Sequence, residues 1–339
     1  MDKLTTLHIG TTKTGSTSIQ AFLAANREFL ASQNVVFPKS LGVANHNSIP
    51  VFVQGKFVPT RLHARQNVKT PEDYEAFTDR LPEQLKAEVG DLDPDHFIIS
   101  NEHMHSRCFR ALHFRRLRAL LEPVLTGRKV RIVVYLRPQI GHVVSLYSTM
   151  LRNGFITTID EFIESKMSGR AHDYFNARVL LDLWSKAFPD ATLVVRPFAD
   201  MGGLEHGVLT DFLEVTDLAK FSDQLAFKPR QNESMGPWSA EALRQLNLLD
   251  PKLPPDMDRV LRRWLRYELP AGRPQPSLDV ARAFQESYAD DNRHVCDEYF
   301  GGDQSVFDVD WSRYEAAPKS NEPKPEQLIA LLQQIANTA

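Results

Sequence analysis

A run of small, hydroxyl-bearing and basic residues lies near the start of the 339-residue chain. It follows a short apolar segment, residues 4–9, precedes a segment of helical spacing that begins at Ser18, and reads Gly10-Thr11-Thr12-Lys13-Thr14-Gly15-Ser16-Thr17. Backbone N–H groups at the start of a helix, together with the positive end of the helix dipole, attract anions. Glycine lets the backbone approach a ligand closely. The run therefore predicts a loop that binds a phosphate-like group.

This loop departs from the loop that binds nucleoside triphosphates. Gly10 and Gly15 have the usual separation, but Ser16 stands where that loop has its lysine, and the lysine of this run is Lys13. A kinase or GTPase also needs an acid near the phosphates to hold Mg²⁺. No aspartate directly follows the second or third predicted strand. We therefore expect a phosphate-like ligand bound without a metal, and a Mg-ATP-dependent kinase or phosphotransferase is the alternative.

The segment from His8 to Ser18 resembles the 5′-phosphosulfate loop of the sulfotransferases that use 3′-phosphoadenosine 5′-phosphosulfate (PAPS). The loop of that family typically reads Pro-Lys-Ser/Thr-Gly-Thr/Ser-Thr, and this chain has Thr12 in place of the proline. That position serves the shape of the loop rather than its chemistry. The resemblance implies PAPS as the donor, adenosine 3′,5′-bisphosphate as the product and no metal. It also implies that the cofactor is bound by Thr12, Lys13, Thr14, Gly15, Ser16, Thr17 and Ser18.

A second resemblance to the same family follows the third predicted strand. Tyr135-Leu136-Arg137-Pro138, followed by Ser145-Leu146-Tyr147, is similar to the motif that binds the 3′-phosphate of the nucleotide. The resemblance assigns that role to Arg137 and Ser145. The chemistry agrees, because a guanidinium group forms charge-assisted hydrogen bonds to phosphate and a serine hydroxyl adds a donor. Arg230 and Asn232 are further candidates, which we expect to close over the nucleotide.

The residues after the second predicted strand are candidates for the general base. They read Ser100-Asn101-Glu102-His103-Met104-His105 and lie where ligands of open parallel sheets bind, beyond the carboxyl ends of the strands. In the carbohydrate-modifying sulfotransferases the base is a glutamate after a strand, and in the cytosolic small-molecule enzymes it is a histidine. We favour Glu102, with His103 or His105 as alternatives and a helix cap as the structural alternative. Lys13 is expected to stabilise the leaving phosphate.

The acceptor is expected to meet the long segment 39–70. His46 lies in this segment and is a candidate for acceptor binding, as is His105. Arg61, His63 and Arg65 make the segment basic, which suits an anionic acceptor such as a uronic acid or an acidic lipid headgroup. A solvated basic surface is the alternative. A small molecule, a carbohydrate and a lipid headgroup all stay open as acceptors, as does the oligomeric state.

The elements that position these residues follow from the apolar pattern. Strands are predicted at residues 4–9, 96–100, 129–136 and 191–195. Helices are predicted at 18–30, 71–89 with an interruption at Pro82, 112–125, 139–151, 175–188, 204–213, 238–249, 256–268, 278–299 and 326–335. This alternation predicts an α/β fold, a three-layer P-loop-type parallel sheet flanked by helices, with a mainly helical C-terminal part. We expect residues 1–220 to form the core and 221–339 a helical extension packed on it within one structural domain.

Composition narrows the function classes. The chain is 42% hydrophobic and 24% charged, with a formal net charge of −3. These values exclude a wholly disordered chain, a collagen, and a nucleic-acid binder that acts through bulk positive charge. Cys108 and Cys296 are too few for a disulfide framework and are expected to be buried thiols. We find neither a signal peptide nor an apolar run long enough to span a membrane, and expect a cytoplasmic protein. A non-catalytic nucleotide-binding or scaffold protein stays as the second alternative.

Overall fold

The computed structural model describes residues 3–198, 201, 204–227, 235–249, 255–267 and 273–314. Tertiary contacts divide the chain into two compact units. Unit 1 consists of Met1–Arg137, Ala177–Arg230 and Val295–Gly302, and unit 2 consists of Pro138–Asn176, Gln231–His294 and Asp303–Ala339. This division differs from the expected boundary at residue 220, since the segment 138–176 groups with the later helices.

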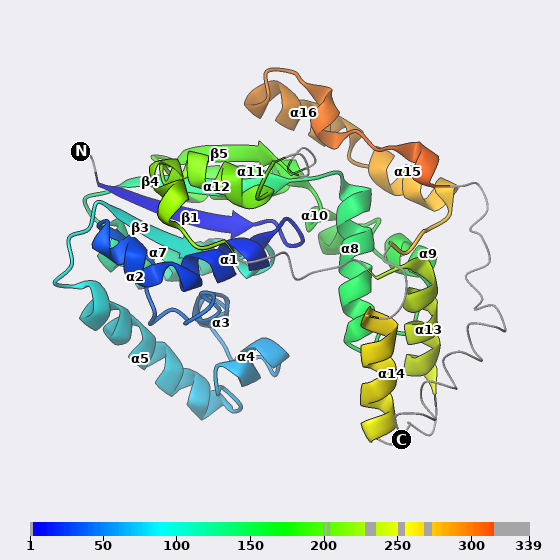
Figure 1. The fold of residues 1–339 in the computed structure, drawn as a ribbon, viewed down its shortest axis with the longest axis horizontal. Helices are drawn as coiled ribbons and strands as arrows, with labels where there is room; N and C mark the ends of the chain where they lie inside the picture. The colour runs from blue at the N-terminus through cyan, green and yellow to red at the C-terminus, as the bar shows by residue number, and fades with distance from the viewer. Residues whose placement is uncertain are drawn as a thin grey trace. The chain divides into compact units, whose positions relative to one another are not determined.

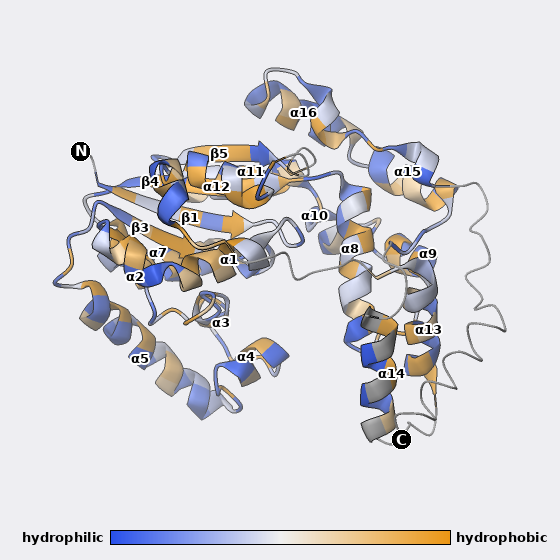
Figure 2. Cartoon of the chain, viewed as in Figure 1, coloured by the Kyte–Doolittle hydropathy of each residue, from blue (hydrophilic) through white to orange (hydrophobic). Residues whose placement is uncertain are grey.

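Unit 1 is built on a parallel sheet of five strands in the order β2-β3-β1-β4-β5 (Figure 1). The strands are β1 (Leu4–Gly10), β2 (Val35–Val36), β3 (His96–Ser100), β4 (Lys129–Leu136) and β5 (Thr192–Pro197). Buried and largely hydrophobic residues form the central strands β1, β3 and β4 (Figure 2). Parallel sheets have this composition because helices cover both of their faces. The predicted α/β class is confirmed.

Helices and one 3₁₀ segment make up the other elements of unit 1. They are α1 (Ser16–Ala25), α2 (Arg27–Ser32), α3 (Ser48–Phe52), α4 (Arg61–Arg65), α5 (Pro71–Val89), α6 (His103–Arg107), α7 (Ala111–Leu125), α11 (Ala177–Ala187), α12 (Val208–Val215) and η2 (Ala219–Gln224). A further helix, α16 (Ala289–Tyr299), begins in unit 2 and ends in unit 1.

Both faces of the sheet are covered by these helices. On one face, α1, α2 and α12 share a hydrophobic core with Tyr135 of β4. On the other face, the Thr5 hydroxyl of β1 donates a hydrogen bond to the Val124 carbonyl of α7. The ring of Phe114 on α7 packs edge-on against Trp184 of α11, with 5.2 Å between the ring centroids. The sheet is thus the middle of three layers.

Unit 2 is helical throughout the part that the structure describes. Its elements are α8 (Gln139–Arg152), α9 (Ile159–Glu164), α10 (Gly169–Asp173), α13 (Pro237–Leu248), α14 (Pro255–Tyr267), α15 (Leu278–Glu286), η3 (Gln304–Phe307) and η4 (Trp311–Arg313). Apolar side chains from α8, α9, α13 and α15 form a common core, which includes Ile140, Val143, Leu151, Phe162, Leu243 and Phe284.

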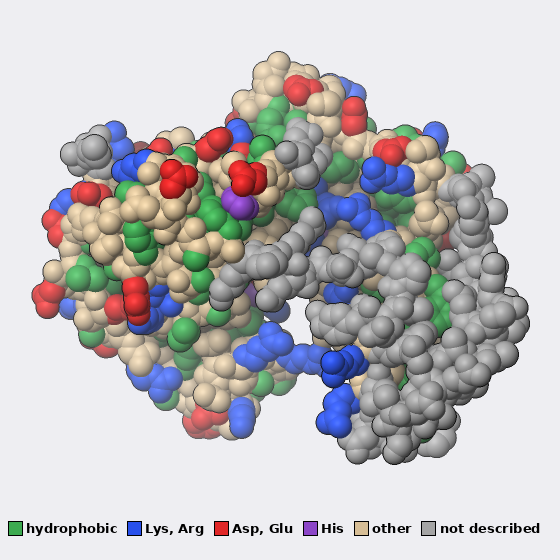
Figure 3. Space-filling model, viewed as in Figure 1, with side chains coloured by type: hydrophobic (Ala, Val, Ile, Leu, Met, Phe, Trp, Pro, Cys, Tyr) green, Lys and Arg blue, Asp and Glu red, His purple; other side chains and the backbone are tan. Residues whose placement is uncertain are grey.

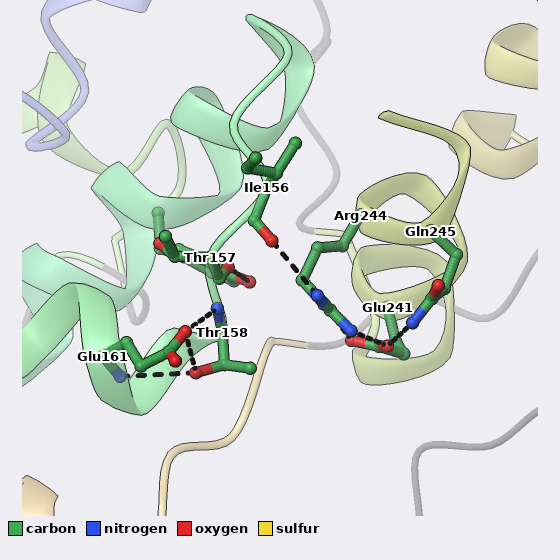
Figure 4. A network of polar contacts seen from close by, with 8 residues as sticks. Ile156, Thr157, Thr158, Glu161, Glu241, Arg244 and Gln245 are labelled. Atoms are coloured by element: carbon green, nitrogen blue, oxygen red, sulfur yellow. Dashed lines mark hydrogen bonds and ion pairs between the residues drawn. The ribbon is translucent and has the colours of Figure 1, made fainter. Parts of the chain in front are cut away.

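Polar contacts join α13 to the turn before α9 in this unit (Figure 4). Arg244 donates from Nη2 to Glu241 Oε1 at 2.6 Å and from Nη1 to the Ile156 carbonyl at 3.1 Å. Thr158 and Glu161 form a capping box at the start of α9. One contact lies within α13, one joins α13 to the turn before α9, and the capping box satisfies the start of α9, so the network has a structural role.

The interruption predicted at Pro82 in the helix over 71–89 is wrong. α5 runs without a break from Pro71 to Val89 and contains Pro82. A proline inside a helix removes one backbone hydrogen bond and costs about 3 kcal/mol. Burial of an apolar face offsets this cost, because each large buried side chain contributes about 1.5–3 kcal/mol. That face consists of Tyr74, Phe77, Leu81, Leu85 and Val89.

Other boundaries also differ from the prediction. The first helix begins at Ser16 rather than Ser18, and Asn26 separates it from α2. The single helix expected over 278–299 is divided into α15 and α16. The short helices α6, α9 and α10 were not predicted. The helix predicted at 326–335 lies outside the described residues.

Candidate active site

The predicted phosphate loop lies at the carboxyl end of the central strand. β1 ends at Gly10 and α1 begins at Ser16, with the loop between them. β3 lies on one side of β1 and β4 on the other, and all three strands run in the same direction. The chain therefore changes its direction of winding at β1, and such switch points are where ligands bind in open α/β sheets. The residues after β3 and β4 belong to the same edge.

Hydrogen bonds to β4 and within the loop itself fix the shape of the loop. The backbone N–H and the hydroxyl of Thr11 both donate to the Tyr135 carbonyl, at 3.2 and 3.1 Å. The hydroxyls of Thr14 and Ser16 both donate to the Thr11 carbonyl, at 2.7 and 3.2 Å, and both side chains are buried. These two hydroxyls hold the loop together. Their residues can serve an anion through the backbone N–H groups at the start of α1, where no side chain caps the helix.

Two glycines in the loop meet specific steric demands. Gly15 has φ +80°, and a Cβ there would lie 2.6 Å from Val208 Cγ1 of α12. Gly10 has φ +107°, and a Cβ there would lie 3.2 Å from the Glu102 Cα. The backbone of the loop is thus packed against α12 on one side and against the end of β3 on the other. Lys13, between the glycines, also has a positive φ of 69°.

Glu102 is the acidic residue that packs against Gly10 of the loop. Gln20 of α1 donates from Nε2 to Glu102 Oε2 at 2.6 Å. Oε1 of Glu102 lies 3.9 Å from His103 Nε2, and the Glu102 side chain is 18% exposed. Glu102 makes no capping hydrogen bond to α6. The carboxyl group is therefore held by α1 and not by the helix that follows it.

Asn101 does the capping at this position. Its Oδ1 accepts a hydrogen bond from the His103 N–H at 2.9 Å, and its Nδ2 donates to Asn47 Oδ1 at 2.8 Å. The structural alternative for Glu102, a helix cap, is accordingly not what the side chain does. Asn101 also ties the end of β3 to the start of α3, which belongs to the segment expected to meet the acceptor.

His103 is the most accessible histidine of the segment after β3. Its side chain is 38% exposed. Burial lowers the pKa of the imidazole, the charge of Glu102 opposes this shift, and Arg107 and Arg65 add to it. The lowered pKa favours a neutral imidazole at neutral pH. His105, two residues further on, is buried in α6.

His46 is a packing residue, and its expected contact with the acceptor is wrong. The side chain is fully buried and stacks on Phe37 with 4.2 Å between ring centroids. Its Nε2 donates to the Pro38 carbonyl at 2.9 Å, and its Nδ1 accepts from the Ser100 N–H at 3.2 Å. Burial lowers the pKa of His46 to about 3. Both ring nitrogens are occupied inside the protein.

Two residues of this edge were missed by the sequence analysis. Gln20 is a polar residue on the buried face of α1, among Ile19, Phe22 and Leu23, and this position was the available signal. His8 is fully buried, and its Nδ1 lies 2.8 Å from Ser100 Oγ. Burial lowers the pKa of His8 to about 4, although the charge of Glu102 opposes the shift. Through this contact His8 links β1 to β3 near the carboxyl ends of the two strands.

Arg137 directly follows β4 and contacts the loop. Its Nη1 donates to the Lys13 carbonyl at 2.9 Å, and its guanidinium carbon lies 5.7 Å from the centroid of the Phe198 ring. Ser145 lies on α8, in unit 2, and is partly buried. Arg230 and Asn232 lie outside the described residues.

A buried ionic network supports the helix against which the loop packs. The Tyr135 hydroxyl donates to Asp211 Oδ2 at 2.8 Å, and Arg196 donates from Nε to Asp211 Oδ1 at 2.9 Å. Burial, and then the charge of Asp211, raise the pKa of Tyr135. The network joins α12 to β4 and β5, so it also fixes Val208, which lies against Gly15.

The described residues contain neither a metal-binding cluster nor a helix that could cross a membrane. No group of three or more His, Cys, Asp or Glu side chains in the described ranges is placed to hold a metal ion. Within the same part of the chain, no helix has both the length and the apolar character needed to cross a membrane. Cys108 and Cys296 are buried free thiols, as predicted.

Comparison with known proteins gives a structural similarity. No family model matches the chain, and no curated protein matches it. Among solved structures, the crystal structure of a sulfotransferase from Alicyclobacillus acidocaldarius is similar, with 13% sequence identity and a TM-score of 0.43. The match covers 92% of this chain and 100% of that one. The function proposed below rests on the geometry of the site.

Proposed function

We propose that this protein is a sulfotransferase that moves a sulfuryl group from PAPS to a hydroxyl or amine of an acceptor. One observation carries the proposal: the anion-binding loop after β1 lies directly against Glu102 at the end of the neighbouring strand, with Gly10 at the contact. An anion site and a general base are thereby neighbours. Transfer of a sulfuryl group to a hydroxyl or amine needs both.

The residues of the loop fit a donor of this kind. The first turn of α1 contains no acidic residue, and no side chain caps its N–H groups. Lys13 adds a positive charge, and Thr12, Thr17 and Ser18 add hydroxyl groups. When bound, PAPS supplies a sulfuryl group that is activated by its bond to a phosphate. The loop would hold the 5′ side of this molecule.

Arg137 and Ser145 are proposed to bind the 3′-phosphate. The guanidinium group of arginine has five N–H donors. The hydrogen bond from Arg137 Nη1 to the Lys13 carbonyl is therefore compatible with phosphate binding, and it couples the position of the guanidinium to the loop. Arg230 and Asn232 are proposed to contribute further contacts to the nucleotide.

Glu102 is proposed as the general base. Gln20 holds Oε2, so Oε1 is the oxygen that accepts the proton of the attacking hydroxyl or amine. His103, beside Oε1, is the alternative base and can contact the acceptor. Lys13 is proposed to stabilise the negative charge that remains on the phosphate side after transfer. Glu102 then takes up the proton on the acceptor side, and Lys13 offsets the negative charge on the donor side.

Calorimetric titration of the full chain tests the donor. The ligands are adenosine 3′,5′-bisphosphate, and ADP with and without Mg²⁺. We expect tight binding that requires the 3′-phosphate and does not respond to Mg²⁺. Preference for Mg-ADP would favour a kinase or phosphotransferase instead. Binding of the bisphosphate without any transfer from radiolabelled PAPS to hydroxyl or amine acceptors would favour a non-catalytic nucleotide-binding protein.

A further inference from the structure

Arg107 lies one helical turn after His103 on α6, so the two side chains are on the same face of that helix. Arg65 ends α4 and Arg107 ends α6. Arg65 is exposed and Arg107 is partly buried. Lys and Arg side chains are visible at the position of α4 in the space-filling view (Figure 3). This basic surface belongs to unit 1, like Glu102 itself.

Hydrogen bonds connect α4 to the end of β3. The Ser48 hydroxyl donates to Gln66 Oε1 at 2.9 Å, which attaches the residue after α4 to the start of α3. Asn47, next to Ser48, accepts from Asn101 Nδ2, and Asn101 caps α6. The basic end of α4 is therefore connected to the segment of Glu102 and His103 through the start of α3.

The charges of these arginines reach the histidines of the site. Besides burial, which is the main cause, Arg107 lowers the pKa of both His63 and His103, and Arg65 lowers that of His103. No ion pair joins Arg65 to a carboxylate in the described ranges of the chain. With the histidines neutral, the arginines set the charge of this surface.

We propose that Arg65 and Arg107 form a subsite for a negatively charged group of the acceptor, a carboxylate or a sulfate. The inference rests on the proposed sulfotransferase function and names its acceptor class. Without such a subsite, the carboxylate of Glu102 would repel an anionic acceptor. Two guanidinium groups beside His103 offset this repulsion and bind the anion through charge-assisted hydrogen bonds.

Binding of a matched pair of sugars tests this subsite. The probes are p-nitrophenyl β-D-glucuronide and p-nitrophenyl β-D-glucoside, which differ by one carboxylate, titrated into protein saturated with adenosine 3′,5′-bisphosphate. We expect the glucuronide to bind at least about tenfold more tightly, as one charge-assisted hydrogen bond provides. Arg65→Gln and Arg107→Gln should each remove most of this preference, and added salt should weaken it. Arg115→Gln, on the exposed surface of α7, is the matched control and should keep the preference.

The outcomes separate this proposal from the one on which it rests. Equal binding of the two sugars, no measurable binding of either, or an undiminished preference in both variants would overturn the subsite. If the wild-type protein fails to bind the bisphosphate, the proposed function itself fails. Bisphosphate affinity and the melting temperature are measured for every variant, because an unfolded protein would lose both together.

Discussion

The loop after β1 and the segment after β3 meet at the same edge of the sheet but are held in different ways. Within the loop, Thr14 and Ser16 bond to Thr11, three and five positions away, and Thr11 in turn bonds to Tyr135 of β4. Glu102, in contrast, is held by Gln20, which is 82 positions away. The first region combines local bonds with anchors to β4, whereas the carboxylate of the second is held by a distant residue alone. Substitutions in the two regions should therefore fail in different ways.

The largest effect is expected at Glu102. Glu102→Gln keeps the shape of the side chain but removes the group that accepts a proton. We expect transfer from PAPS to fall by about 10²–10⁴-fold, the range for loss of a general base, with affinity for adenosine 3′,5′-bisphosphate nearly unchanged. Steady-state transfer assays and calorimetry on the same preparation measure both. Loss of nucleotide affinity instead would make Glu102 part of the loop's structure and leave His103 as the base.

Lys13→Ala should differ from Glu102→Gln in its effect on nucleotide affinity. Lys13→Ala removes the positive charge of the loop, and we expect transfer to fall by about 10²–10³-fold, as loss of a preorganised electrostatic contact does. Affinity for the bisphosphate should also fall, unlike in Glu102→Gln. Transfer rates and calorimetric titration give the two numbers. Turnover near the wild-type level would contradict the role given to Lys13.

The same contrast explains what the sequence could and could not reveal. The loop and the Arg137 position were predictable, because a strand, a glycine pair and a strand-end arginine are readable from neighbouring residues. The parallel sheet was predictable from its apolar runs. The roles of Gln20 and His46 depend on which distant segments pack together. His46 has the residue type of a binding group, yet its contacts with Pro38 and Ser100 make it structural.

The glycines of the loop offer a third test, on stability. Gly15→Ala would place a methyl group 2.6 Å from Val208 Cγ1, at a φ of +80°. We expect a loss of about 1–3 kcal/mol in the free energy of unfolding. Gly127→Ala is the matched control, since Gly127 has φ +72° with no atom near the added methyl group. It should lose only about 1 kcal/mol, from backbone strain.

Urea unfolding of the two variants measures the difference. A larger loss in Gly15→Ala than in Gly127→Ala assigns the excess to the contact with α12. Equal losses would mean that α12 shifts to accommodate the methyl group, and that the packing of the loop against Val208 does not define its shape. In that case the shape of the loop would not depend on its contact with α12.

The smallest effect, and the sharpest test of the long-range region, is expected at Gln20. Gln20→Met keeps the length of the side chain but removes the N–H that Glu102 Oε2 accepts at 2.6 Å. A base that is wrongly oriented lowers the rate of transfer but does not change the binding of the donor. We expect kcat to fall about tenfold, which corresponds to the free energy of one hydrogen bond to a charged group. The KM for PAPS and the melting temperature should stay unchanged. Gln33→Met, on the exposed end of α2, is the control.

A double-mutant cycle distinguishes positioning from a general structural role. If Gln20 acts through Glu102, Gln20→Met should have no further effect on the rate in a Glu102→Gln background. If Gln20 only fills space in α1, the two losses should multiply and the melting temperature should fall in both backgrounds. Because Gln20 lies on α1, directly after the phosphate loop, the first result would make that helix the element that couples the donor side of the site to the base.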